Sequence, residues 1–240
     1  MYIDHLLNKS QYCCLYPYAA PSGPPRGVVS SPQSNNSVIV QWQPPEEEHW
    51  NGPLLGYMIR FKPSGYPDST LKHKNITNYL ITTDLLRGLI VWQEYEVSVA
   101  AYNAKGVGIY SIVVYVRTQE GHPTASPFNV TSHALSSTTI RLTWMPPDPQ
   151  YINGINQGYK IYARQAGSEQ HEIEVVVLSN VSNMLGKQEG FIHNLKKYSE
   201  YVITVLCFTS QGNGPKSNPV QERTLQDGKY LLILILFMIE

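Results

Sequence analysis

The sequence predicts an all-β protein built from two tandem β-sandwiches, and three observations support this prediction. The chain repeats itself, because the segment around Trp42 recurs around Trp144 and the segment around Tyr95 recurs around Tyr201. Short stretches of alternating apolar residues lie between turns rich in Pro and Gly, which is typical of strands that bury one face. No stretch of a dozen residues combines the period and the caps of a helix. A repeat of about 100 residues is the size of a free-standing domain and is too long for a solenoid unit.

The spacing inside the repeat indicates two domains of one kind. Trp42 and Trp144 are each followed by two prolines, then by Asn-Gly and Gly-Tyr pairs at the same distances. Further along, Leu89 precedes Tyr95 by the same interval as Leu195 precedes Tyr201. The second half of the repeat is shifted by a few residues relative to the first half, so we expect one small insertion in the second copy.

The strands can be placed from the alternation. Residues 37–42 and 139–144 alternate so that one face of each strand is apolar, and the members of that face are Val38, Val40, Trp42, Ile140, Leu142 and Trp144. Residues 95–101 and 201–207 repeat the pattern, each beginning at the tyrosine. We therefore expect the two indoles and the two phenols to form the centres of two separate cores.

Each copy resembles a fibronectin type III domain, an immunoglobulin-like β-sandwich. The resemblance lies in the Trp that closes the second strand, the Pro-Pro after it, and the Leu before the Tyr that opens a later strand. It implies that Tyr95 and Tyr201 form tyrosine corners, in which the ring packs inward and the hydroxyl bonds a backbone group upstream. Leu89 and Leu195 then belong to the core. The first copy departs from the family pattern at residues 91–93, where Val, Trp and Gln stand.

Three stretches make the resemblance more specific than the domain family alone. Residues 88–97, 151–160 and 205–209 are similar to adjacent repeats of the Sidekick family of neural adhesion molecules, and Asn156 and Gln157 lie in a turn with no evident packing role. Membership implies homophilic cell adhesion at synapses, on the extracellular side of the plasma membrane. The family's recognition residues lie in immunoglobulin domains outside this chain, so no binding site is carried over.

Two other classes of protein remain open. The chain could be an ectodomain fragment of a receptor tyrosine phosphatase or of another fibronectin type III receptor, or part of a secreted matrix protein. The remaining reading frame distinguishes them: a phosphatase domain downstream indicates the receptor, and a missing membrane segment indicates the matrix protein.

The repeat also sets the expected domain boundaries. We predict an irregular segment over 1–23, fibronectin type III domains over 24–119 and 127–226 with a linker at 120–126 between them, and an apolar tail over 227–240. Two prolines near the linker favour a semi-rigid spacer. Residues 1–20 do not have the pattern of a secretory signal. The apolar run 231–239 would extend roughly 13 Å as a helix, against a hydrocarbon core of about 30 Å, and we interpret it as the product of a partial gene model.

Candidate modification and contact residues are few. The sequons within the repeats are glycosylation candidates, namely Asn35, Asn75, Asn129 and Asn180, and a further sequon precedes them at Asn8. Trp50 follows the charged run Glu46–Glu48, which we interpret as a solvated loop. We consider Trp50 a possible partner contact, although such an indole more often lies on its own sandwich.

The composition argues against several functions. Eighteen basic and eighteen acidic side chains leave no net charge, and no basic stripe suits nucleic acid or an anionic membrane. The seven histidines form no zinc motif, and we find no nucleophile elbow, Walker loop or dinucleotide fingerprint. The Gly-x-Gly pairs at 106–108 and 212–214 are expected to be turn glycines. Cys207 is in phase with the buried face of its strand and is expected to be an inert thiol. We therefore expect no enzyme, cofactor, metal or small-molecule substrate, and we expect protein partners.

Overall fold

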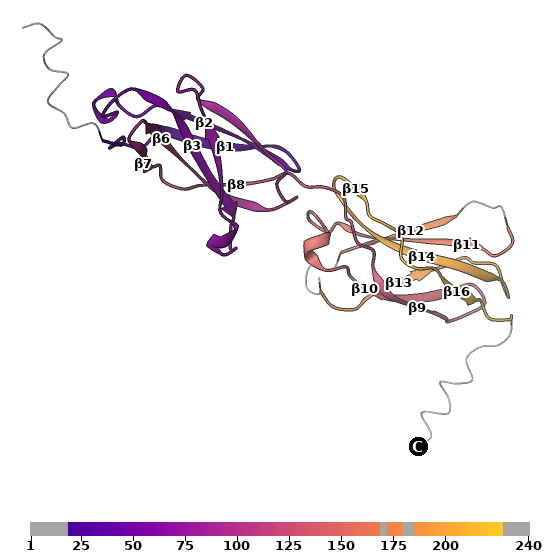
Figure 1. The fold of residues 1–240 in the computed structure, drawn as a ribbon. Coiled ribbons are helices and arrows are strands. Elements are labelled where there is room, and N and C mark those ends of the chain that lie inside the picture. The colour runs from indigo at the N-terminus through magenta and orange to yellow at the C-terminus, as the bar shows by residue number, and fades with distance from the viewer. Residues whose placement is uncertain (1–18, 169–171, 180–184, 228–240) are drawn as a thin grey trace, which may run out of the picture. The chain divides into compact units, whose positions relative to one another are not determined.

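The computed structural model describes residues 19–168, 172–179 and 185–227. The chain divides into two units, one ending at Gln119 and the other beginning at Glu120. Each unit is a sandwich of two antiparallel sheets (Figure 1), so the all-β prediction is confirmed. The only helical elements in the described part of the chain are three single turns of 3₁₀-helix, at Glu47–His49, Asp68–Thr70 and Pro149–Tyr151.

The first unit has eight strands. They are β1 (Arg26–Ser34), β2 (Ser37–Gln43), β3 (Leu54–Pro63), β4 (Lys72–Ile76), β5 (Thr83–Arg87), β6 (Glu94–Asn103), β7 (Gly106–Tyr110) and β8 (Val114–Arg117). One sheet has the order β1-β2-β5. The other has the order β4-β3-β6-β7, and β8 continues along β6 after a break that follows Tyr110.

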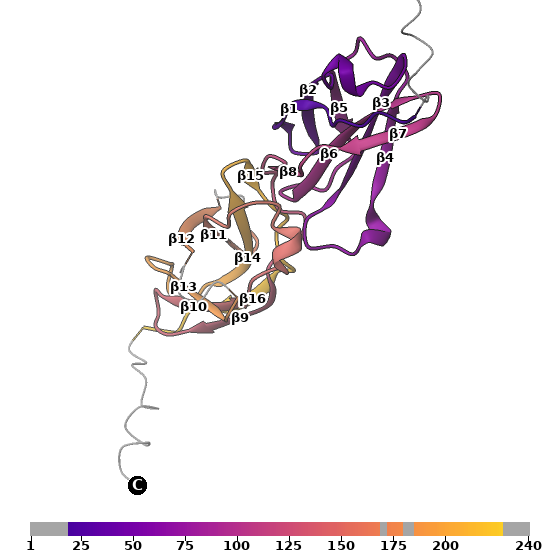
Figure 2. The ribbon, with the colours of Figure 1, turned by 90° about the vertical axis from the view of Figure 1, so that its left-hand side faces the viewer.

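The second unit repeats this arrangement. Its strands are β9 (Phe128–Ala134), β10 (Ile140–Met145), β11 (Gly158–Gln165), β12 (Ile173–Leu178), β13 (Gln188–Ile192), β14 (Glu200–Thr209), β15 (Gly212–Asn213) and β16 (Val220–Arg223). The sheets have the orders β13-β10-β9 and β12-β11-β14-β15, with β16 also paired to β14. Figure 2 shows both layers of this unit from a second direction.

Each unit encloses its own apolar core. Trp42 is 4% exposed and meets Tyr57 edge to face, with ring centroids 5.2 Å apart. Trp144 is fully buried and meets Tyr159 at the same separation. Such edge-to-face pairs add roughly 0.5–1.5 kcal/mol to the burial of the rings. The indoles therefore occupy equivalent positions at the centres of two independent cores, each with its own set of buried residues.

A bulge occurs at the same place in the first strand of both units. In β1 the pairing with β2 shifts between Arg26 and Val29, and Gly27 has φ +56°. In β9 the pairing with β10 shifts near Phe128, and Asn129 has φ +50°. Glycine and asparagine are among the residues that adopt this left-handed conformation most readily. The left-handed conformation at this bulge is thus adopted by a glycine in the first unit and by an asparagine in the second.

Residues 19–23 belong to the segment 1–23 that we predict as irregular. They have no regular secondary structure and are bound to the first sandwich. The side-chain amide of Asn103 donates to the carbonyl of Ala19 at 2.7 Å, and that of Asn51 donates to Ala20 at 3.0 Å. A Cβ atom on Gly108 would lie 2.4 Å from the carbonyl oxygen of Pro21. Residue 108 therefore has to lack a Cβ atom for the segment to lie against this strand.

The predicted linker is bound in the same way to the second sandwich. Asn153 donates to the carbonyl of His122 at 3.1 Å, and the Thr209 hydroxyl donates to Gly121 at 2.7 Å. Glu120 accepts the backbone N–H of Ile155 at 2.9 Å. These bonds satisfy backbone groups that a free linker would leave to water. Residues 120–125 are thus the counterpart of 19–23, and a signal for this was present, because both segments place a proline at the same repeat position.

Candidate functional site

Two tyrosine corners stabilise the sandwiches at equivalent places. The Tyr95 hydroxyl accepts the backbone N–H of Ile90 at 2.9 Å, and the Tyr201 hydroxyl accepts that of Lys196 at 2.9 Å. Tyr95 is 4% exposed and Tyr201 is 3% exposed. Burial raises the pKa of the Tyr95 phenol above its ordinary value, since the charged phenolate is disfavoured away from water. Leu89, 7% exposed, and Leu195, 3% exposed, lie in the cores beside these corners.

A buried threonine makes two further hydrogen bonds at each tyrosine corner, a role that was not predicted from the sequence. Thr118 is 1% exposed, donates to the carbonyl of Ile90 at 2.8 Å and is the acceptor for the backbone N–H of Gln93 at 3.0 Å. Thr224 makes the same two bonds in the second unit, to Lys196 at 2.7 Å and from Ser199 at 2.9 Å. The signal for these residues was the repeated Arg-Thr pair.

The departure from the family pattern at residues 91–93 leaves the corner intact. Trp92 has φ +54° and Tyr198, its counterpart, has φ +46°. The Arg117 guanidinium lies 5.3 Å from the Trp92 ring centre, as Arg223 does from the Tyr198 ring. A guanidinium at this distance from an aromatic ring is attracted to its face. The same cation-π contact therefore stabilises this turn in both units.

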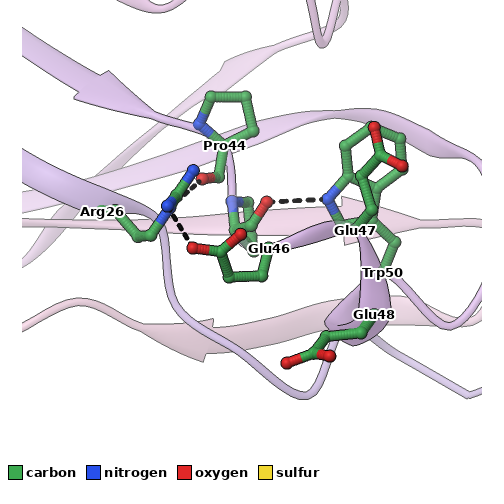
Figure 3. A pocket seen from close by; sticks show the side chains of 7 residues that line it. Arg26, Pro44, Glu46, Glu47, Glu48 and Trp50 are labelled. Carbon is green, nitrogen blue, oxygen red and sulfur yellow. Dashed lines mark hydrogen bonds and ion pairs between the residues drawn. The ribbon is translucent and has the colours of Figure 1, made fainter.

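The candidate contact Trp50 lines an open groove at one end of the first unit (Figure 3). The groove has a volume of about 570 Å³ and is lined by Arg26, Pro44, Pro45, Glu46, Glu47, Glu48 and Trp50. The Trp50 indole N–H donates to the carbonyl of Pro45 at 2.9 Å, and its ring meets Tyr79 edge to face at 6.3 Å. Trp50 also packs against the apolar core of the unit. The structure thus places this indole on its own sandwich, with one edge facing the groove.

Two of the three glutamates of the groove lie beside a basic side chain. The Glu46 carboxylate forms an ion pair with Arg26, whose Nε also donates to the carbonyl of Pro44 at 3.1 Å. Glu48 lies 3.5 Å from His49 and is largely exposed. Exposed pairs of this kind contribute little to stability. The groove therefore has the features of a solvated loop whose carboxylates face water.

Of the four candidate sequons in the repeats, three fall in the described residues. Asn35 is exposed in the turn between β1 and β2, Asn75 is exposed on the edge strand β4, and Asn129 is exposed at the bulge in β9. Asn180 and Asn8 lie outside the described residues. The side chains of the three described asparagines can each carry a glycan without displacing the core.

The remaining residues singled out in the sequence have structural roles. Cys207 is buried and unpaired, and burial raises the pKa of its thiol to about 11, so it is protonated at neutral pH. Among the Gly-x-Gly pairs, Gly106 and Gly212 have positive φ as expected. Gly108 and Gly214 do not, and each instead allows a proline of the bound leading segment to approach.

The packing of Asn156 differs from what we expected from the sequence. We expected no packing role for it, yet it is 7% exposed and its amide donates to the Tyr159 hydroxyl at 3.0 Å. Its carbonyl oxygen accepts the N–H of Gly158 at 3.1 Å. The fold alone therefore explains part of the similarity in this stretch.

The described residues contain no group of three or more His, Cys, Asp or Glu side chains that could hold a metal ion. In this same part of the chain, none of the helices is both long and apolar enough to cross a membrane.

Comparisons with known proteins agree with the architecture. The fibronectin type III domain family matches residues 23–117 and 125–223. The chain is 46% identical over 211 residues to "Protein sidekick-2" of Gallus gallus, covering 88% of this chain and 10% of that protein. It is 45% identical over 217 residues to "Protein sidekick" of Drosophila melanogaster, again covering 88% and 10%. The chain spans about a tenth of the length of the curated relatives it matches.

Among solved structures, the chain is similar to the "Crystal structure of chicken CNTN1 FN1-FN3 domains". The sequence identity is 26%, the TM-score is 0.42, and the match covers 87% of this chain and 66% of that one.

Proposed function

The chain belongs to the fibronectin type III family and, within it, to the Sidekick proteins, and on this premise we propose that it is part of the extracellular region of a cell-surface adhesion molecule. The observation that carries the proposal is the identity of 46% with a Sidekick protein over 211 residues. This identity runs through both units and their connection, beyond what a shared fold requires. In the complete molecule the adhesion is homophilic and takes place at synapses, through domains outside this chain.

Within such a molecule the two units act as a non-enzymatic spacer. Their most repeated features are the corners, the bound leading segments and the indole pairs, all of which stabilise the sandwich itself. Gln119 donates its backbone N–H to Ser34 of the first unit at 3.1 Å, and Glu120 is bonded to the second unit. Gln119 and Glu120, which meet at the boundary, are thus each bonded to one of the units, which supports a spacer role.

The three described sequons support an extracellular location. Each of Asn35, Asn75 and Asn129 is exposed, and a glycan is a bulky, solubilising group that has to face water. In the full-length protein expressed on animal cells, we expect glycopeptide mass spectrometry to find all three occupied. Finding all three bare in protein taken from the cell surface would contradict the extracellular assignment.

A domain exchange tests the spacer role. Cells that display the full-length molecule should aggregate with their own kind, and deletion of residues 19–227 should reduce aggregation. Replacement of these residues by two unrelated fibronectin type III domains should restore it, because only the span is supplied. Loss of aggregation after the replacement, with normal surface display, would show that these domains themselves carry recognition.

A purified chain gives a second test. At micromolar concentration we expect it to sediment as a monomer, because adhesion lies elsewhere in the molecule. A tight dimer at this concentration would contradict that division.

A further inference from the structure

The two units differ most at one sheet edge. The strands β4 and β12 occupy equivalent places, because β4 pairs with β3 and β12 pairs with β11. Strand β4 carries Lys72, His73 and Lys74, then the sequon residue Asn75. Charged side chains, above all lysine, are the usual protection of an exposed strand edge against pairing with another chain. The edge of the first unit is therefore protected.

Strand β12 has no such protection. It reads Ile-Glu-Val-Val-Val-Leu, with Val176 50% exposed and Leu178 76% exposed. It contains no proline, and its pairing with β11 runs without a bulge from Leu178 to Ile173. Among the described residues, β11 is the only strand paired with it, and β12 lies at the edge of its sheet (Figures 1 and 2).

The positions can be matched residue by residue. Asn75 pairs with Met58 in the first unit, and Val176 pairs with Lys160 in the second. Met58 and Lys160 follow the repeated Gly-Tyr pair at the same distance, so Asn75 and Val176 are equivalent. Where the first unit carries a glycosylation candidate, the second exposes a valine.

We propose that β12 is a self-association edge, which pairs antiparallel with β12 of a second copy of this chain and joins two sheets into one. Its side chains are complementary to themselves. With the two-fold axis at Val176, Val175 lies opposite Val177 of the second copy, and Glu174 lies opposite Leu178. Opposite residues in this register project from the same face of the sheet.

The charges favour a second copy in this register. Glu174 lies 3.1 Å from the ammonium of Lys160 on the neighbouring strand, so the edge brings no unpaired carboxylate into the contact. A slide that centred the pair on Glu174 would place two carboxylates opposite each other, and like charges at opposite positions destabilise a sheet. The pairing of Val176 with Val176 of the second copy and the separation of the two Glu174 carboxylates thus both favour the alignment centred on Val176.

The edge is short, and this sets the expected strength. Contacts that bury less than about 1,200 Å² in total are weak and transient, and six residues a side fall well within that class. We expect a dissociation constant on the order of 100 μM or weaker. Dimers would form where copies are concentrated on one surface. The inference goes beyond the spacer role and does not depend on it.

The test uses the full chain in sedimentation velocity from micromolar to near-millimolar concentration. We expect reversible formation of a dimer and no larger species, because a two-fold contact closes on itself. Val176→Lys should weaken the dimer at least about tenfold by placing two ammonium groups opposite each other. The matched control is Asn75→Lys, the same change at the equivalent position of the first unit, which should leave the dimer unchanged. A thermal melt checks that both variants fold.

Cross-linking tests the register independently. The sequence also contains Cys13 and Cys14, which are first replaced by serine so that they cannot react. In this background, Val176→Cys should give a covalent dimer with a short bismaleimide, and Asn75→Cys should not. A chain that stays monomeric at the highest concentration overturns the proposal. So does a dimer that Val176→Lys leaves intact, growth into larger aggregates, or equal cross-linking at both positions. None of these outcomes bears on the adhesion assay, so the two proposals fail separately.

Discussion

Replacing Thr118 by Val is expected to destabilise the first unit by about 1–3 kcal/mol. The hydroxyl donates to Ile90 at 2.8 Å and accepts from Gln93 at 3.0 Å, and the residue is 1% exposed. Valine has nearly the same shape, so no cavity forms and packing is kept. The change removes two part-buried hydrogen bonds, and each contributes about 0.5–1.5 kcal/mol net.

Calorimetry can assign this loss to one unit. The two units enclose separate cores, so their unfolding need not be a single two-state transition. A domain of this size loses about 4–8 °C in its midpoint for each kcal/mol, so Thr118→Val should lower the midpoint of the first unit by about 4–24 °C. Thr224→Val, the equivalent change, should lower that of the second unit by a similar amount.

Thr204→Val provides the control in the same fold. Its hydroxyl is buried and has no hydrogen-bond partner, so removing it should be neutral or stabilising. If Thr118→Val has no larger effect than Thr204→Val, the assignment of stability to the hydroxyl bonds is wrong. Thr118→Ser should recover most of the loss, because serine keeps the hydroxyl.

Four further predictions follow from the packing and the buried groups. Gly108→Ala should cost about 1–3 kcal/mol in a denaturant titration, because the new methyl meets the Pro21 backbone; an unchanged midpoint would show that the leading segment is not bound there. In a chain with Cys13→Ser and Cys14→Ser, Cys207, whose pKa burial raises to about 11, should react with a thiol reagent at neutral pH only after denaturant unfolds the chain, and rapid native labelling would contradict its burial. Burial raises the pKa of the Tyr159 phenol from 10.0 to about 12, so its contribution to stability is complete below pH 10 and is lost as the pH rises toward 12; Tyr159→Phe should flatten this fall in urea titrations. Trp144→Ala should cost about 3–5 kcal/mol, and only the second unit's transition should move.

The sequence predicted the features that depend on spacing and alternation. Trp42 and Tyr95, with their counterparts, lie in the two cores because a period of two fixes which face of a strand is buried. The sequence could not predict how residues 19–23 and 120–125 are bound. Those segments carry no alternation. The repeated prolines and the repeated Asn-Gly pairs mark both partners, but nothing in the sequence shows that amides such as Asn153 bind carbonyls 31 residues away.

Side-chain roles at turns were harder to infer than strands. Thr118 and Thr224 were visible as repeated residues, but a buried threonine that bonds two backbone groups has the same sequence pattern as one that only fills space. Asn156 was misjudged for the same reason. The unprotected edge at β12 became apparent only after β4 and β12 could be aligned through their partners, because the inserted residues of the second copy obscure the comparison in sequence.

The bulge in β9 has a practical consequence for any test of the sequon at Asn129. The backbone of Asn129 is left-handed, and its side chain is a candidate glycan acceptor. The customary exchange to glutamine would place a longer residue in a conformation that it adopts with strain, so a loss of stability could be mistaken for an effect of the missing sugar. Asn129→Gly, which introduces the residue found at the equivalent position of the first unit, removes the sequon and keeps the left-handed conformation.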